Sequence, residues 1–202
     1  SEYKNTKKDK DRGYLLRNEL EQLVTFNCDK KKDELVKDLF IFSCFTGLSY
    51  SDMKGLKNSN LQDFFDGNRW IIVRRKKTAT SSNVMLLDIP KMIIEKYAGL
   101  SKDGKVFPVP SNTICNDSLK RISQLIDCLV EKKVTFHLAR HTFATLFLSE
   151  GVPLESLSKM LGHKNIATTQ IYAKILNEKV GKDMQKVSNK FKGLEQSFVS
   201  QL

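Results

Sequence analysis

All three histidines of the chain lie between residues 137 and 163, and an arginine and a tyrosine accompany them. His137 and Arg140 are three residues apart, so on a helix they would share one turn. The free N–H groups at the start of a helix attract an anion, and a guanidinium adds a forked donor. The segment FHLARHTFATLFLSEG therefore predicts a helix with an apolar body and a phosphate-binding site at its first turn.

Two further polar residues follow. His163 comes directly after Gly162, where we expect a helix to end, and Tyr172 lies on what we expect to be another helix. Each feature has an ordinary explanation. His137 and Arg140 could be a capping cluster, His163 could lie in an exposed loop, and Tyr172 could belong to the core. Their occurrence in one short window favours a functional site instead. We expect His141, which directly follows the arginine, to point elsewhere on the helix and to support packing.

The net charge indicates a polyanionic partner. Lys and Arg number 34 against 23 Asp and Glu, which gives +11 at pH 7. Nucleic acid is the leading candidate, and a membrane surface or simple solubility are the alternatives. The four cysteines form no C-x-x-C pair, so we expect reduced core residues of a cytoplasmic protein. No apolar run approaches the ~18 residues of a membrane span, so no membrane partner is expected.

Helical patterns dominate the chain, with one exception. Residues 61–89 include a β-rich run and the dipeptide Asp66-Gly67, a strong hairpin signal. They predict a small antiparallel sheet of three strands. Elsewhere apolar residues recur at helical spacing, and Asn18 is expected to cap the first helix. The predicted fold class is therefore α+β and predominantly α-helical.

The order and spacing of the polar residues resemble the C-terminal signature of the tyrosine recombinases, the phage integrase family. The family's H-x-x-R, G-H and Y elements match His137–Arg140, Gly162–His163 and Tyr172. Upstream, FTGLSYSDMKGL is similar to the first arginine box, T-G-L-R-x-S-E-L, and RRKKTATSSNVMLLDIP to the β-hairpin lysine motif. The resemblance runs from about Gly13 to about Lys182 and implies the tyrosine-recombinase catalytic fold.

The resemblance also implies a reaction. Tyr172 would attack a phosphodiester of double-stranded DNA and form a 3′-phosphotyrosine, leaving a free 5′-hydroxyl. Arg140, His137 and His163 would stabilise the transition-state charge, and His137 could also help to move the tyrosine proton. Lys77 would protonate the departing 5′-oxygen. Because protein cations do this work, no metal, ATP or other cofactor is expected.

One position departs from the family pattern. Ser49 stands where the family has an arginine, and a serine cannot make a forked phosphate contact. Another cation substitutes, the enzyme is slow, or the residue was changed deliberately. Arg75 is the best internal substitute, because we expect it to share a strand face with Lys77; general contact with the DNA backbone is its alternative role. DNA contacts are also expected from the neighbouring Arg74, Lys76 and Thr78.

Boundaries and assembly are expectations of the same kind. Residues 1–12 resemble the linker from an N-terminal DNA-binding domain, 13–192 form the catalytic domain, and 193–202 are a tail that docks on a neighbouring subunit or folds back. The implied function is site-specific integration by a conjugative transposon or related mobile element, at the bacterial nucleoid. Tetramers would form on paired sites. The alternatives are a DNA-binding relative inactivated by Ser49 and a type IB topoisomerase-like enzyme.

Overall fold

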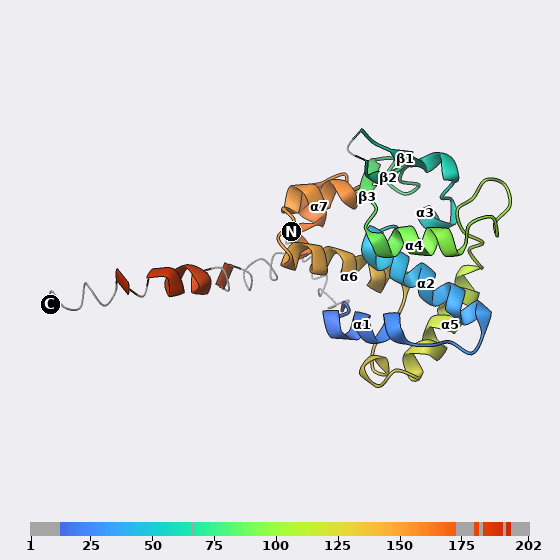
Figure 1. Ribbon diagram of the computed structural model, residues 1–202, viewed down its shortest axis with the longest axis horizontal. Coiled ribbons are helices and arrows are strands. Elements are labelled where there is room, and N and C mark those ends of the chain that lie inside the picture. Colours follow the sequence, from blue (N-terminus) through green and yellow to red (C-terminus); the bar gives the residue numbers. More distant parts are fainter. Residues whose placement is uncertain (1–12, 66, 173–179, 182–183, 192, 195–202) are drawn as a thin grey trace, which may run out of the picture.

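The computed structural model describes residues 13–65, 67–172, 180–181, 184–191 and 193–194. Helices dominate, and a small sheet lies at one end of the molecule (Figure 1). The α-helices are α1 (Arg17–Thr25), α2 (Lys31–Thr46), α3 (Tyr50–Lys54), α4 (Asp88–Lys96), α5 (Asn112–Gln124), α6 (Phe136–Ser149) and α7 (Leu154–Met160). The 3₁₀ helices are η1 (Asn58–Asn60), η2 (Asp127–Leu129), η3 (Ile166–Thr168) and η4 (Gln170–Tyr172), and the strands are β1 (Leu61–Asp63), β2 (Arg69–Arg74) and β3 (Ser81–Met85).

Helix α2 is the centre of the fold. It packs against α4, α5 and α6, and its side chains are buried on nearly every face (Figure 1). Such a helix is apolar all round instead of amphipathic, as expected for an element surrounded by protein. It ends at Gly47, whose φ of 67° is left-handed and whose N–H donates to the carbonyl of Ser43 over 2.9 Å. The end of α2 is therefore fixed in the interior, beside α6.

The predicted three-stranded sheet is confirmed. Its order is β1-β2-β3, antiparallel throughout, and Ile71 of β2 pairs with Val84 of β3. The sheet is tied to the end of α7 by side chains that donate to main-chain carbonyls: Ser82 Oγ to Met160, and Thr80 Oγ1 to Gly162, both over 2.5 Å. The β2–β3 turn is thereby held against the residues that follow α7.

One local expectation was wrong. Asn18 does not cap α1: the helix begins earlier, with Leu16 at the N-cap position and Glu19 accepting from the Leu16 N–H over 2.7 Å. Tyr172, expected on a helix, lies in the 3₁₀ helix η4; residues 173–179 lie outside the described residues, and residues 180–181 and 184–191 are helical. The tail at 193–202 lies almost wholly outside the described residues, as does the linker at 1–12. Among the described residues, no helix is long and apolar enough to cross a membrane.

The end of α2 provides a test of the fold. A Cβ at Gly47 would lie 2.7 Å from Cδ1 of Phe143, whereas a Cβ at Gly99 would meet nothing within 4 Å. Both glycines have left-handed φ, so Ala at either site costs about 1–2 kcal/mol of backbone strain. We expect Gly47→Ala to lower the free energy of urea unfolding clearly more than the Gly99→Ala control does. Equal losses would mean that the contact with Phe143 does not constrain the helix end.

Candidate active site

Arg140 on α6 joins the ends of two other helices. Its Nη1 donates to the carbonyl of Gly47, at the end of α2, over 2.6 Å. Its Nη2 donates to the carbonyl of Leu161, at the end of α7, over 2.5 Å. The last carbonyls of a helix have no partner within it and carry partial negative charge, so they hold a cation well. The guanidinium is thus fixed by main-chain atoms and not by a carboxylate.

Arg75 reaches the same carbonyl from the β2–β3 turn. One of its terminal nitrogens, Nη1, also donates to the carbonyl oxygen of Leu161. Its Nε lies 2.6 Å from Oδ2 of Asp52, and both side chains are almost fully buried, 7% and 3% exposed. The Nε–H is not aligned on that oxygen as a hydrogen bond, so the contact is mainly one of charge. The structure therefore brings Arg75 and Arg140 together.

The charges of this cluster do not balance. Burial first, and then repulsion by Arg75, lower the pKa of Arg140 to about 9, which leaves it charged at neutral pH. Among the described residues, Asp52 is the carboxylate that pairs with these two arginines, which leaves one positive charge in excess there. Such an arrangement suits an anion.

Ser49 forms hydrogen bonds with Asp52, the residue whose carboxylate pairs with Arg75. It caps α3, accepts from the Asp52 N–H over 3.3 Å and donates its hydroxyl to Oδ2 of Asp52 over 2.6 Å. The other carboxylate oxygen accepts from the N–H of Lys76 over 3.1 Å. A short side chain at position 49 thus leaves Asp52 available to Arg75, where an arginine would compete for it.

The β2–β3 turn separates residues that we expected on one strand face. Strand β2 ends at Arg74, so Arg75 and Lys77 do not share a face of it: Arg75 is buried and Lys77 is exposed in the turn. That expectation was wrong because the chain leaves the strand one residue too early. Thr78 donates to the carbonyl of Gly162 over 3.2 Å, and the exposed Arg74 donates to the carbonyl of Ala79 over 2.9 Å.

His163 is held beside the two arginines. It follows Gly162, whose φ is 59° and where a Cβ would lie 2.7 Å from Cγ of Arg75, so only glycine fits without displacement. Its Nδ1 lies 2.8 Å from the hydroxyl of Thr169. Burial, and then the charges of Arg140 and Arg75, lower the pKa of His163 to about 4. The imidazole is therefore neutral at neutral pH, with Nδ1 engaged by a hydroxyl.

Tyr172 is buried against α6, where it meets the histidine that we expected to support packing. Its hydroxyl lies 2.7 Å from Nδ1 of His141, and both residues are 7% exposed. Nε2 of His141 lies 2.9 Å from Nε2 of His137, and the two rings meet edge to face. The expectation for His141 missed these contacts. His137 and His141 are four residues apart and so share one face of the helix, which is the signal in the sequence that could have predicted their contact.

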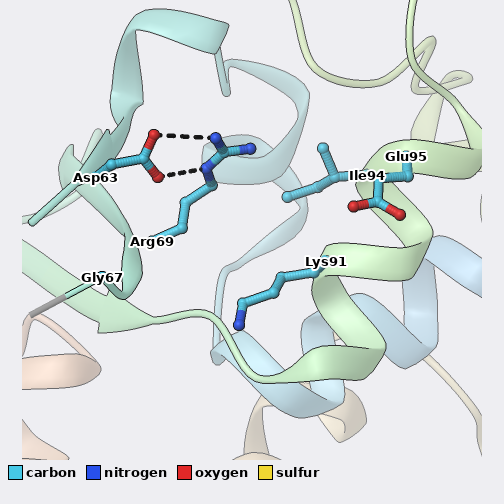
Figure 2. Close-up of a pocket in the computed structure, with 6 residues that line it drawn as sticks. All are labelled: Asp63, Gly67, Arg69, Lys91, Ile94 and Glu95. Atoms are coloured by element: carbon cyan, nitrogen blue, oxygen red, sulfur yellow. Dashed lines mark hydrogen bonds and ion pairs between the residues drawn. The ribbon is translucent and has the colours of Figure 1, made fainter.

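The described cavities lie elsewhere. A hollow of about 310 Å³ lies between the sheet and α4, and Figure 2 shows its lining, with Arg69 bonded to Asp63 through two contacts. Its lining contains none of the predicted site residues. Among the described residues, no group of three or more His, Cys, Asp or Glu side chains could hold a metal ion. The candidate site is the convergence of cations and phenol described above.

The low pKa of His163 makes stability depend on pH. The unfolded chain takes up a proton near pH 6.5 but the folded site resists it until about pH 4, so stability is complete above 6.5 and is lost as pH falls. His163→Asn keeps an acceptor for Thr169 and cannot titrate. We expect its unfolding free energy to fall less than that of the parent between pH 7.5 and 5, measured by urea titration. Lys164→Gln is the control, and an unchanged slope in His163→Asn would contradict this account.

Comparison with protein-family models matches residues 13–179 to the phage integrase family. The tyrosine recombinase XerA of Saccharolobus solfataricus is 32% identical over 156 residues, which cover 77% of this chain and 50% of that protein. XerA of Thermococcus onnurineus is 30% identical over 166 residues, 78% of this chain and 56% of that protein. The chain thus spans about half the length of the curated relatives it matches.

A solved structure gives the same fold. The XerH site-specific recombinase, bound to a palindromic difH substrate, superposes with a TM-score of 0.69 at 20% identity, over 87% of this chain and 53% of that one. At this identity the likeness shows the fold alone. The family model matches most of the chain, and the Saccharolobus XerA is 32% identical to it over a segment that covers 77% of this chain. The chain therefore belongs to the phage integrase family of tyrosine recombinases.

Proposed function

We propose that the chain is the catalytic domain of a site-specific recombinase, which cuts and rejoins double-stranded DNA through a 3′-phosphotyrosine. The observation that carries the proposal is the pair of guanidinium groups, Arg140 and Arg75, which converge on the Leu161 carbonyl with an excess of positive charge. A scissile phosphate is an anion that suits such a place, and a forked donor suits its two non-bridging oxygens. The phenol of Tyr172 supplies a nucleophile coupled electrostatically to Arg140.

The chemistry follows from these groups. Tyr172 loses its proton, and Oη attacks phosphorus while the bond to the 5′-oxygen breaks. Arg140 and the neutral His163 donate to the phosphate oxygens as negative charge develops, which is where fixed donors lower the barrier most. Lys77 gives the departing 5′-oxygen its proton. The phosphotyrosine retains the energy of the broken bond, so a 5′-hydroxyl from another strand can displace Tyr172 without ATP.

Arg75 is proposed to do the work of the arginine that Ser49 replaces. Arg75 is buried beside Arg140 and is oriented by the carboxylate of Asp52. The same carboxylate accepts a hydrogen bond from the hydroxyl of Ser49. The charge of Arg75 comes from the β2–β3 turn instead of the end of α2, but it reaches the same carbonyl. The exposed Arg74 and Lys76 and the half-buried Thr78 would then serve general contact with the DNA backbone.

The substrate and assembly are proposed on charge and on likeness. A net charge of +11 suits a long polyanion, and one similar fold is that of the Tn1549 transposon integrase in complex with circular intermediate DNA, with a TM-score of 0.65 at 17% identity over 82% of this chain and 63% of that one. We propose a mobile-element integrase that acts at the bacterial nucleoid and assembles as a tetramer on paired sites. Residues 1–12 would lead from a DNA-binding domain, 13–192 would be catalytic, and 193–202 would dock on a neighbouring subunit.

The nucleophile can be tested directly. In a DNA duplex nicked just downstream of the cleavage site, the short fragment that carries the new 5′-hydroxyl diffuses away after cleavage, which traps the covalent intermediate. We expect a protein–DNA adduct in denaturing gels that is absent in Tyr172→Phe. Tyr50→Phe is the control, because Tyr50 donates to the carbonyl of Pro110 over 2.7 Å and takes no part in the site. An adduct in Tyr172→Phe would identify a different nucleophile, and none in the parent chain would favour a binding protein inactivated by Ser49.

The substitution by Arg75 makes a separate prediction. Arg75→Ala should slow single-turnover cleavage at saturating protein by about 10²–10³-fold, the usual loss for one transition-state donor. DNA binding should fall far less, since one phosphate contact among many is lost. Adding Ser49→Arg to Arg75→Ala should recover part of the rate, because an arginine at 49 can use the freed Asp52.

The control for Arg75→Ala and the double variant is Arg74→Ala, which removes an exposed cation one residue earlier in the chain. It should weaken binding and leave the saturated rate unchanged. Circular dichroism must show that Arg75→Ala is folded, since its removal leaves Asp52 buried without its partner. A near-normal saturated rate in folded Arg75→Ala would contradict the substitution and move the search to Lys76 or to a residue outside this chain.

A further inference from the structure

A continuous chain of polar atoms leads from the buried nucleophile to the surface. It runs from the Tyr172 hydroxyl to Nδ1 of His141 over 2.7 Å, and from Nε2 of His141 to Nε2 of His137 over 2.9 Å. Tyr172 and His141 are buried, whereas His137 is exposed at the first turn of α6. The chain therefore connects the interior of the protein with the place proposed for the phosphate.

The hydrogen bonds of this chain support one consistent direction. A phenol that donates to Nδ1 of His141 requires the proton of that ring to be on Nε2. That Nε2–H then donates to Nε2 of His137, whose own proton is on Nδ1. All three groups are neutral in this arrangement, and the phenolic proton and the Nε2 proton of His141 each have one acceptor within the chain.

Resting on the recombinase chemistry above, we propose that His141 is the proton acceptor for Tyr172 and passes the charge to His137. When Oη attacks phosphorus, the phenolic proton moves to Nδ1 of His141, and the proton on Nε2 of His141 moves to Nε2 of His137. His137 becomes an imidazolium, and His141 is neutral again with its proton on Nδ1. The proton for the 5′-oxygen comes separately from Lys77, so each transfer balances.

The relay places charge where the reaction needs it. A proton that stayed on buried His141 would add a cation next to Arg140 in a poorly hydrated interior. On exposed His137 the same proton lies beside the phosphate as its negative charge grows, and Arg140 stabilises the phenolate through its coupling to Tyr172. Among the described residues, the charged and titratable groups near this chain include Arg140 on α6 and, beyond it, Arg75 of the β2–β3 turn, Asp52 of α3 and His163 after α7.

His141→Asn separates a proton acceptor from a mere support. The Asn oxygen can replace Nδ1 as a partner for the phenol but cannot carry its proton. Single-turnover adduct formation at saturating protein should be about 10²-fold slower at pH 7, the usual contribution of a positioned base. It should then rise tenfold between pH 7 and 8, below the pKa of Arg140, because only phenolate formed by solvent can attack and a phenol has a pKa of about 10. The parent rate should be level in that range.

A sulfur leaving group distinguishes the two proton transfers. In a substrate with a 5′-bridging phosphorothiolate the leaving atom needs no proton, so Lys77→Ala should recover its rate while His141→Asn should not. Recovery of both variants would overturn the relay, as would a pH profile of His141→Asn parallel to that of the parent. If His141→Asn does not fold, His141→Gln replaces it, because Gln is closer in volume to His. The same rates and the same pH profile are then measured.

The matched control is Thr142→Ala, at the adjacent buried position of α6. Its hydroxyl accepts from the N–H of Leu15 over 2.9 Å, so the variant loses stability without touching the chain of histidines. It should keep the parent pH profile. Tyr172→Phe is measured in parallel: an adduct in that variant would overturn the proposed function, whereas its absence together with an unchanged profile in His141→Asn would overturn the relay alone.

Discussion

The carbonyl oxygen of Leu161 accepts from two guanidinium groups, one buried and one half-buried, and the rest of the site depends on this contact. Placing like charges together in the interior is unfavourable, and it is tolerated when fixed partners hold both. One partner is the end of α2 at Gly47, another is the end of α7, and the third is Asp52. The packing of α2 against α6 and of the sheet against α7 serves to bring these three partners to one point.

Two of these partners, the end of α7 and Asp52, limit which residues can lie beside them. Gly162 must lack a side chain because Arg75 lies where a Cβ would be. Ser49 must be small enough to leave Asp52 to Arg75, and it also holds that carboxylate by donating its hydroxyl. The excess positive charge among the described residues is costly in the free protein and becomes favourable if an anion binds. The proposed phosphate site would thus exchange some stability for directed binding of an anion.

Sequence reasoning succeeded where the information was local. The pair His137 and Arg140 shares a turn because the helix repeat places it there, and Asp66-Gly67 with its flanking residues predicted the β1–β2 hairpin. It failed where distant segments decide the outcome. The burial of Arg75 depends on Asp52 and Leu161, which are far away in the chain, and a strand-face argument could not reach them. The family resemblance fixed the order of the motifs, but not which atoms they share.

His141 and Tyr172 illustrate the same limit at closer range. Tyr172 was expected on a helix and lies in a 3₁₀ helix, a weaker element than an α-helix. Side-chain contacts of this segment include Tyr172 with His141 and Thr169 with His163, and the N–H of Tyr172 donates to the carbonyl of Thr169 over 3.1 Å. Because one short segment carries the proposed nucleophile and contacts His163, a shift of the phenol towards a phosphate would also move the proposed phosphate donor. The two arginines are held by helix ends, by Asp52 and by the β2–β3 turn, whereas Tyr172 lies on a 3₁₀ helix, an element with poorer hydrogen-bond geometry than an α-helix.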